Sequence, residues 1–114
     1  MDNLIKYITW NNLKSNKEQI EMIVGKYAEN HNVYIANLVI VGTTVSFTTY
    51  SKISYEDLVA RLIRKHYPLN EEFAILRKAI LNPSQEYYDY NAYVEDCKVR
   101  AKAFIEERNK VLEV

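Results

Sequence analysis

Residues 33–50 contain the pattern that most restricts the fold of this chain. Val33 to Val41 is rich in β-branched and other apolar residues and is interrupted by Asn37. Gly42-Thr43 follows, and glycine at the first position of a two-residue turn is typical of type II′. From Thr44 to Tyr50, hydroxyl residues alternate with apolar ones, so one face of the segment is apolar. The segment 33–50 is therefore predicted to be a β-hairpin.

An isolated hairpin is marginally stable in water, so this one requires a further strand or a packed helix. Residues 4–10 are ambiguous between a short helix and a strand. We favour a strand, because Ile8 and Trp10 alternate with Thr9 and residues that prefer strands dominate the segment. The prediction is a small antiparallel sheet made of the hairpin and a third strand at 4–10.

The remaining segments carry helical signals, namely apolar residues at helical spacing and polar residues that cap helix starts. The predicted helices are residues 15–29, 54–66, 70–81 and 84–110. Ser15 and Glu18 resemble a capping box for the first helix. Ser54, Asn70 and Ser84 are the predicted N-caps of the other three.

The first helix carries an apolar face that includes Ile20 and Val24, and the third carries Phe73, Leu76 and Ile80. A sheet that precedes three consecutive helices belongs to the α+β class. A chain of 114 residues fits one domain, so the prediction is a single α+β domain over residues 1–114.

The charge of the chain is balanced, with 15 basic and 15 acidic residues. No overall field attracts it to nucleic acid or to a membrane surface. Its apolar runs are too short to cross a bilayer, and Met1-Asp2-Asn3 does not begin a signal peptide. Cys97 is the single cysteine, so no internal disulfide is expected. These features predict a cytoplasmic location.

Residues that perform chemistry are few and scattered. The two histidines, His31 and His66, and Cys97 show no metal-ligand spacing, so we expect no metal, no cofactor and no enzymatic activity. His66 follows Arg64 and Lys65 at a predicted helix end, where a cation suits the helix dipole. Cys97 lies on the apolar stripe of the last helix, where cysteine packs as a small hydrophobe.

Arg61, Arg64 and Lys65 form a candidate basic face on the helix 54–66, because their spacing places them on one side. Such a face can bind phosphate groups, which makes nucleic acid a candidate partner. The alternative is an ordinary solvated surface balanced by nearby glutamates. We prefer this alternative, because no aromatic residues alternate with the charges as stacking platforms.

Tyr87, Tyr88, Tyr90 and Tyr93 are the most unusual local group, in a chain with ten tyrosines and three phenylalanines. Tyr87 and Tyr90 share a side of the predicted helix, Tyr93 lies near it, and Tyr88 diverges. Tyrosine is enriched at protein interfaces, since it offers a large contact area at little entropic cost. Packing within the core, with the hydroxyls in water, explains the group equally well. We take these four residues as a candidate interface.

The second half of the chain also resembles a known group of proteins. The segments that carry the resemblance are Tyr55 to Tyr67, Glu71 to Lys78, Tyr90 to Lys98, and Ala101-Lys102. Together, over about residues 54–103, they resemble small uncharacterised proteins that bacteriophages and prophages of gut bacteria encode, often among tail or late genes. The resemblance implies no catalytic residues.

This resemblance implies a phage-encoded protein of the bacterial host cytoplasm or of the virion. The expected function is non-enzymatic protein–protein interaction, as a minor virion or tail component or an assembly factor, with self-association or another protein as partner. One alternative is a phage inhibitor of a host protein, and another is nucleic-acid binding through the basic face.

Overall fold

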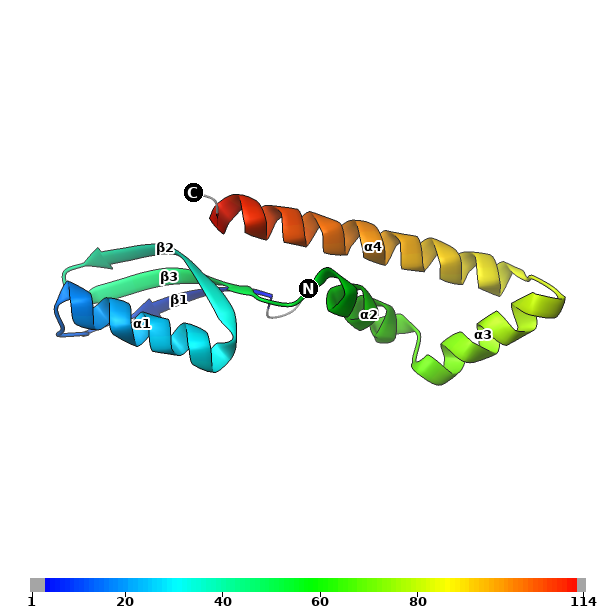
Figure 1. The fold of residues 1–114 in the computed structure, drawn as a ribbon, viewed down its shortest axis with the longest axis horizontal. Coiled ribbons are helices and arrows are strands. Elements are labelled where there is room, and N and C mark those ends of the chain that lie inside the picture. Colours follow the sequence, from blue (N-terminus) through cyan, green and yellow to red (C-terminus); the bar gives the residue numbers. More distant parts are fainter. Residues whose placement is uncertain (1–3, 113–114) are drawn as a thin grey trace. The chain divides into compact units, whose positions relative to one another are not determined.

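The computed structural model describes residues 4–112, which form a three-stranded antiparallel sheet and four helices (Figure 1). The elements in chain order are β1 (Ile5–Trp10), α1 (Lys17–His31), β2 (Val33–Val41), β3 (Thr44–Ser51), α2 (Tyr55–His66), α3 (Leu69–Leu81) and α4 (Gln85–Leu112). The predicted α+β class, with three C-terminal helices, is confirmed.

The chain divides between Lys52 and Ile53 into two compact units. The first contains the sheet and α1, and the second contains α2, α3 and α4. Whether the two units behave as the single predicted domain stays a prediction, and each unit is described separately below.

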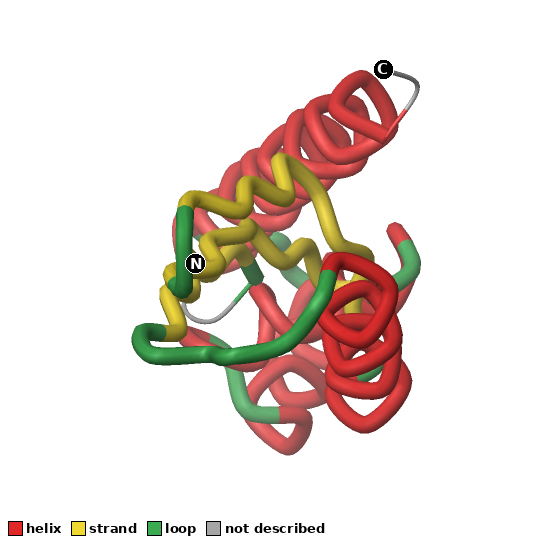
Figure 2. Tube along the Cα trace, turned by 90° about the vertical axis from the view of Figure 1, so that its left-hand side faces the viewer, coloured by secondary structure: helices red, strands yellow, loops and turns green. Residues whose placement is uncertain are grey.

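In the first unit, β3 lies between β1 and β2 (Figure 1; the strands are yellow in Figure 2) and pairs antiparallel with both. The segment 4–10 is therefore a strand, as predicted, and its Ile8 pairs with Phe47 of β3. Gly42 in the hairpin turn has a φ of 60°. This is the left-handed conformation that the predicted turn requires at its first position and that glycine adopts without strain.

A β-bulge in β2 explains why its sequence is apolar on both faces. Asn37 and Leu38 together lie opposite the single β3 residue Phe47, so the pairing shifts by one residue between Ala36 and Val39. Asn37 adopts a left-handed φ of 56°, which asparagine tolerates better than most residues. The extra residue reverses the alternation, and side chains before and after the bulge therefore reach the same core.

That core lies between the sheet and α1. Ile20 and Val24 of α1 are buried with Val45 and Phe47 of β3. Partly buried side chains surround them, namely Ile8, Trp10, Leu13, Tyr27, Ile35, Leu38 and Ile40. Trp10 and Tyr27 contact Phe47 edge to face, the geometry that aromatic quadrupoles favour.

The bounds of α1 differ from the prediction by two residues at each end. The N-cap is Asn16, whose side chain accepts a 2.8 Å hydrogen bond from the Gln19 backbone amide. The Gln19 side chain accepts one in return from the Asn16 amide, so the capping box predicted for Ser15 and Glu18 is formed one residue later. The helix ends at His31, and its C-cap residue Asn32 adopts a left-handed conformation.

In the second unit, Ser54 caps α2 as predicted, because its hydroxyl accepts a hydrogen bond from the Asp57 amide. The predicted cap of α3 is wrong. Pro68 occupies the cap position and Asn70 lies inside the first turn. A residue before proline is held out of the helical region, so Tyr67 is extended and the chain re-enters a helix directly after Pro68. Ser84 immediately precedes α4, as predicted.

Both α2 and α3 pack against α4. Buried side chains from all three helices form this core, namely Leu58, Leu62, Ile63, Ile75, Tyr90, Cys97 and Ala101. Near its end, α4 contributes Arg108, whose guanidinium donates a 2.8 Å hydrogen bond to the Ile53 carbonyl. The long helix α4 is therefore the element on which α2 and α3 are assembled.

Candidate interaction surface

The four tyrosines of the predicted interface lie on the first turns of α4 but occupy different environments. Tyr90 is buried, Tyr87 and Tyr93 are half-buried, and Tyr88 is 56% exposed. Tyr87 and Tyr88 contact each other edge to face. The group therefore separates into a pair at the surface and a pair that packs between helices.

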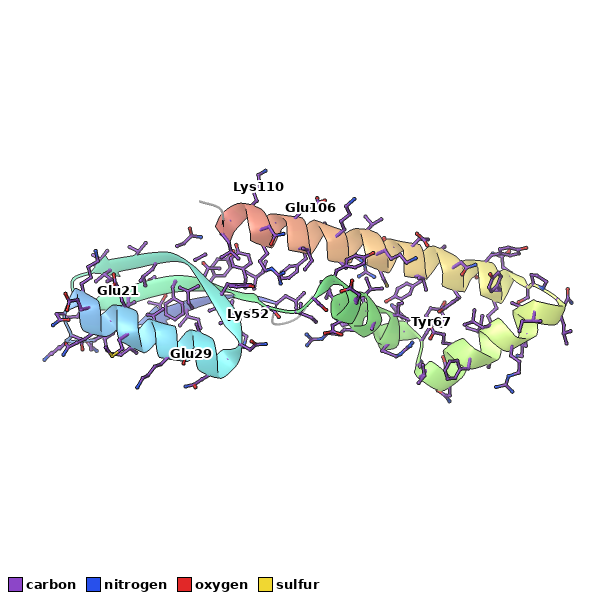
Figure 3. All side chains as sticks on the ribbon, in the orientation of Figure 1. Glu21, Glu29, Lys52, Tyr67, Glu106 and Lys110 are labelled. Carbon is purple, nitrogen blue, oxygen red and sulfur yellow. The ribbon has the colours of Figure 1, made fainter. Side chains whose placement is uncertain are left out.

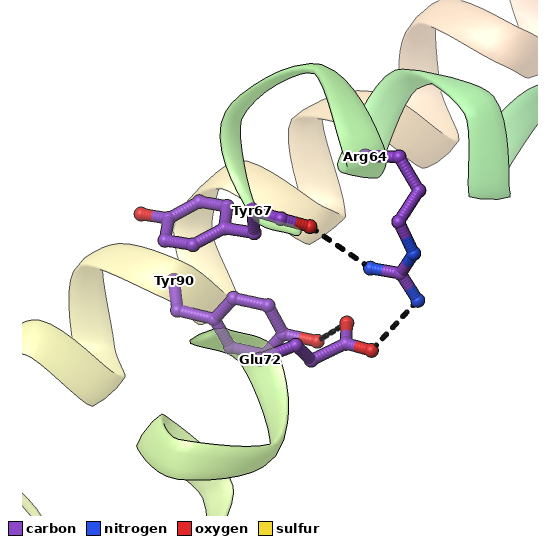
Figure 4. A network of polar contacts seen from close by, with 4 residues as sticks. All are labelled: Arg64, Tyr67, Glu72 and Tyr90. Atoms are coloured by element: carbon purple, nitrogen blue, oxygen red, sulfur yellow. Dashed lines mark hydrogen bonds and ion pairs between the residues drawn. The ribbon is translucent and has the colours of Figure 1, made fainter. Parts of the chain in front are cut away.

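Tyr90 belongs to a polar network that joins the three helices (Figure 4). Its hydroxyl donates a hydrogen bond to Glu72 of α3, and the other carboxylate oxygen of Glu72 lies 2.9 Å from the Arg64 guanidinium of α2. Arg64 also donates to the Tyr67 carbonyl, at 3.1 Å. The Tyr67 ring, at the end of α2 (Figure 3), meets the Tyr90 ring edge to face. One carboxylate thus connects α2, α3 and α4.

The electrostatics of this network match its geometry. The hydrogen bond from Arg64 lowers the pKa of Glu72, against the opposing effect of its burial. Burial, together with the hydrogen bond to Glu72, raises the pKa of Tyr90 to about 12. Glu72 is therefore held as a carboxylate and Tyr90 as a neutral donor over the whole physiological range.

Tyr93 is held in a similar way one turn further along α4. Its hydroxyl donates a 2.8 Å hydrogen bond to the Leu62 carbonyl of α2. Its ring meets those of His66 and Tyr67. Tyr90 and Tyr93 thus have partners within the second unit, while Tyr87 and Tyr88 remain at its surface.

The candidate basic face, Arg61, Arg64 and Lys65, lies on α2, and all three residues are exposed. Arg64 is engaged by Glu72 and the Tyr67 carbonyl. Its guanidinium is therefore engaged at the helix junction, although the residue itself is exposed.

The second unit has an exposed apolar surface that the sequence did not predict to face solvent. It lies on α3, where Leu69, Phe73, Leu76, Ile80 and Leu81 are all exposed. Ile80 and Leu81 are 82% and 90% exposed, values more typical of charged residues. The sequence predicts Phe73, Leu76 and Ile80 as the apolar residues of this helix, but the buried residue is Ile75. Leu69, Phe73, Leu76 and Ile80 share one side of the helix, and we call these four residues the α3 face; Leu81 lies about 100° around the helix from Ile80.

An open groove of about 340 Å³ connects the α3 face to Tyr87 of α4. It is lined by Leu76, Ala79, Ile80, Pro83 and Tyr87. Tyr87 is thus shared between the predicted tyrosine interface and the α3 face. The structure therefore places Tyr87 beside the exposed apolar residues Leu76 and Ile80 of α3.

The first unit offers two weaker candidates. A groove of about 610 Å³ runs between α1 and β2, lined by Ser15, Lys17, Ile20, Glu21, Leu38 and Ile40. On the sheet, Tyr7 and Val41 are exposed on opposite outer strands. Hydroxyl side chains of β3, such as Ser46, lie between those strands, so these apolar residues do not form one patch.

Within residues 4–112, no group of three or more His, Cys, Asp or Glu side chains is placed to hold a metal ion. Cys97 is buried in α4, as predicted, and the Arg100 guanidinium lies 3.6 Å from its sulfur. In the same described range, no helix has the length and apolar character needed to cross a membrane.

Comparison of the chain with protein-family models, with curated proteins and with solved structures found no match.

Proposed function

We propose that this chain is a non-enzymatic phage- or prophage-encoded protein that acts by protein–protein interaction, as a minor virion or tail component or an assembly factor. Its contact surface is the α3 face together with Tyr87 and Tyr88. The observation that carries the proposal is the exposure of five large apolar side chains on one helix of thirteen residues. The phage setting rests on the sequence resemblance over residues 54–103.

The energetics of burial support an interaction at this surface. Moving one Leu, Ile or Phe side chain out of water is worth about 1.5–3 kcal/mol. A contiguous group of such residues is costly to leave in solvent and is typical of a protein-binding site. Tyr87 and Tyr88 extend the patch with a residue type that is enriched at interface hot spots.

The polar residues nearby support a structural rather than a catalytic role. Arg64, Glu72 and Tyr90 satisfy one another and fix the angle at which α3 leaves α2. Together with the buried Ile75, this network holds α3 against α4 and leaves the α3 face, on an adjacent side of the helix, open to a partner. An interaction surface on a preorganised helix loses less entropy on binding than one on a loop.

The experiment compares partner capture by the wild-type chain and two variants in cells of the phage's bacterial host. Ile80→Glu places a charge at the centre of the surface, and we expect it to reduce capture of a phage structural protein at least tenfold. Val99→Glu is the matched control, because Val99 is an exposed aliphatic residue on α4, 66% exposed and outside this surface. The measurement is quantitative mass spectrometry of the co-purified proteins during phage production.

Equal capture by the wild-type and Ile80→Glu chains, or no phage protein captured at all, would contradict the proposal. Capture of a host protein from uninfected cells, lost in Ile80→Glu, would instead support the alternative of a host-directed inhibitor. Salt-dependent retention on DNA that requires Arg61 and Lys65 would support the nucleic-acid alternative.

A further inference from the structure

The second unit has another groove, on a different side of α3 from the α3 face. Its volume is about 400 Å³, and it is lined by Tyr67, Glu71, Ala74, Ile75 and Glu86. These residues come from the end of α2, from α3 and from the first turn of α4. Glu71 lies about 160° around the helix from Phe73 of the α3 face. The groove is therefore a surface separate from the α3 face.

Two carboxylates from different helices line this groove. Glu71 lies in the first turn of α3, and Glu86 lies in the first turn of α4. Within the part of the chain that the structure describes, neither side chain makes a hydrogen bond or an ion pair. Glu72 differs from its neighbour Glu71, because Arg64 and Tyr90 both contact its carboxylate. The groove thus carries two negative charges that are not balanced as that of Glu72 is.

The helix dipoles explain only part of this arrangement. An acidic side chain in a first turn is favoured by the dipole of its own helix, which accounts for the sign of each charge. It does not account for two such side chains at one groove, where like charges repel each other. Lys78 follows Ala74 by one turn on the same side of α3, but it does not line the groove. A bound cation would remove the repulsion between the two carboxylates.

The rest of the groove is apolar and aromatic. Ala74 and the buried Ile75 provide aliphatic surface. Tyr67 is half-buried, and its ring extends away from the ion pair of Arg64 and Glu72 (Figure 4). An aromatic ring attracts a cation, and aliphatic surface suits the methylene stem of a long basic side chain. The groove therefore combines the surfaces that the two parts of such a side chain require.

We propose that this groove binds an arginine side chain of a protein partner, with the guanidinium against the carboxylates of Glu71 and Glu86 and the methylene groups over the aliphatic floor. Charge complementarity selects this occupant, because an acidic segment would be repelled and an apolar one would bury two unpaired carboxylates. Arginine is preferred to lysine, since its planar guanidinium pairs with carboxylates and stacks on aromatic rings. The site goes beyond the proposed function, because it shares no residue with the α3 face.

The first test uses two capped amino acids as probes of the groove. N-acetyl-arginine methylamide carries the guanidinium, and N-acetyl-citrulline methylamide has nearly the same shape without the charge. Each probe is titrated into the ¹⁵N-labelled full chain, and the amide chemical shifts are followed by NMR. The arginine probe should shift the amides of Ala74, Ile75 and Glu86 saturably. The citrulline probe should bind about tenfold more weakly, because it forms neither ion pair.

Substitutions of the two carboxylates identify the residues that hold the probe. Glu71→Gln and Glu86→Gln each keep the shape of the side chain and remove one charge, so each should weaken arginine binding about threefold. The double variant should weaken it about tenfold. Glu106→Gln is the matched control and should leave binding unchanged, because Glu106 is an exposed glutamate of α4 outside the groove (Figure 3). Helicity by circular dichroism verifies that each variant is folded.

Equal binding of the two probes, no saturable shift at the groove, or equal arginine binding by the wild-type chain and the double variant would each overturn the proposal. The partner-capture experiment provides the second test. The double variant should capture at least one protein about tenfold less than Glu106→Gln does. Capture of the same proteins in the same amounts by both would overturn the assignment to a protein partner. Capture that does not depend on Ile80 would contradict only the proposed function.

Discussion

Tyr90 is predicted from the sequence to belong to an interface, but in the folded chain it packs between helices. Its spacing placed it in a candidate interface with Tyr87, Tyr88 and Tyr93. In the folded chain it is buried and donates to Glu72, which Arg64 also contacts. A buried hydroxyl that has a charged partner contributes more to stability than an exposed one. The structural role of Tyr90 is therefore to lock α3 onto α4.

Replacing Tyr90 with phenylalanine tests this role. Tyr90→Phe removes the hydroxyl and keeps the ring, so the free energy of unfolding should fall by about 1–2 kcal/mol. Tyr88→Phe is the matched control at an exposed tyrosine and should change stability by less than about 0.5 kcal/mol. Urea denaturation measures both values. Equal effects of the two substitutions would show that the network contributes nothing specific.

The pH dependence of the stability of the wild-type chain and of Tyr90→Phe gives an independent check. In the folded chain the Tyr90 pKa is raised from 10 to about 12, so the folded state retains a proton that the unfolded state loses above pH 10. The stabilisation by Tyr90 is complete below pH 10 and declines as the pH rises to 12. The stability difference between the wild-type chain and Tyr90→Phe should therefore narrow over this interval. A stability difference that stays constant between pH 10 and 12 would contradict the raised pKa of Tyr90 in the folded chain.

At the scale of single elements, the structure decides between two adjacent residues that could each be the N-cap of α1. Both Ser15 and Asn16 are good capping residues, and glutamate or glutamine follows each at the required distance. The structure selects Asn16, whose amide and side chain both exchange hydrogen bonds with Gln19. The apolar face explains the choice, because a helix that begins at Lys17 directs Ile20 and Val24 into the core.

Alanine substitutions at Asn16 and Ser15 measure how much each residue contributes to stability as a cap of α1. Asn16→Ala should lower the free energy of unfolding by about 1 kcal/mol, since it leaves a helix-end amide without its partner. Ser15→Ala should have little effect, because its hydroxyl makes no capping bond to α1. Thermal or urea unfolding of both variants gives the comparison. A larger loss of stability in Ser15→Ala than in Asn16→Ala would favour the capping box predicted for Ser15 and Glu18.

At the scale of the whole molecule, the division between Lys52 and Ile53 raises the question of cooperativity. Trp10 is the single tryptophan and packs in the core of the first unit, against Tyr27 and Phe47. Its fluorescence therefore reports on that unit. Most helical residues belong to α2, α3 and α4, so far-UV circular dichroism is dominated by the second unit.

The single-domain prediction has a measurable consequence for these two probes. One cooperative domain loses both signals at the same urea concentration. Tyr90→Phe, in the second unit, should then lower the midpoint seen by Trp10 in the first unit as well. Two separate midpoints, with Tyr90→Phe moving one of them, would identify two independently folding units.

Local patterns in the sequence determined the elements of this protein. The hairpin, the third strand and all four helices follow from apolar spacing, turn residues and caps that act within a few positions of each other. Errors occurred where two local solutions compete, as at Ser15 and Asn16, or where a neighbouring proline sets the start of a helix, as at Pro68. The bulge at Asn37 interrupts a strand that the sequence describes as apolar on both faces.

The tertiary structure decided which apolar and aromatic residues are covered. Helical spacing identified Phe73, Leu76 and Ile80 as one apolar stripe, but it contains no information on whether another element packs there. Because Ile75 and the Glu72 network fix α3 against α4 on a different side, the stripe faces solvent and Tyr90 is buried. Burial depends on contacts between residues distant in sequence, so the surface we propose for interaction emerged only from the fold.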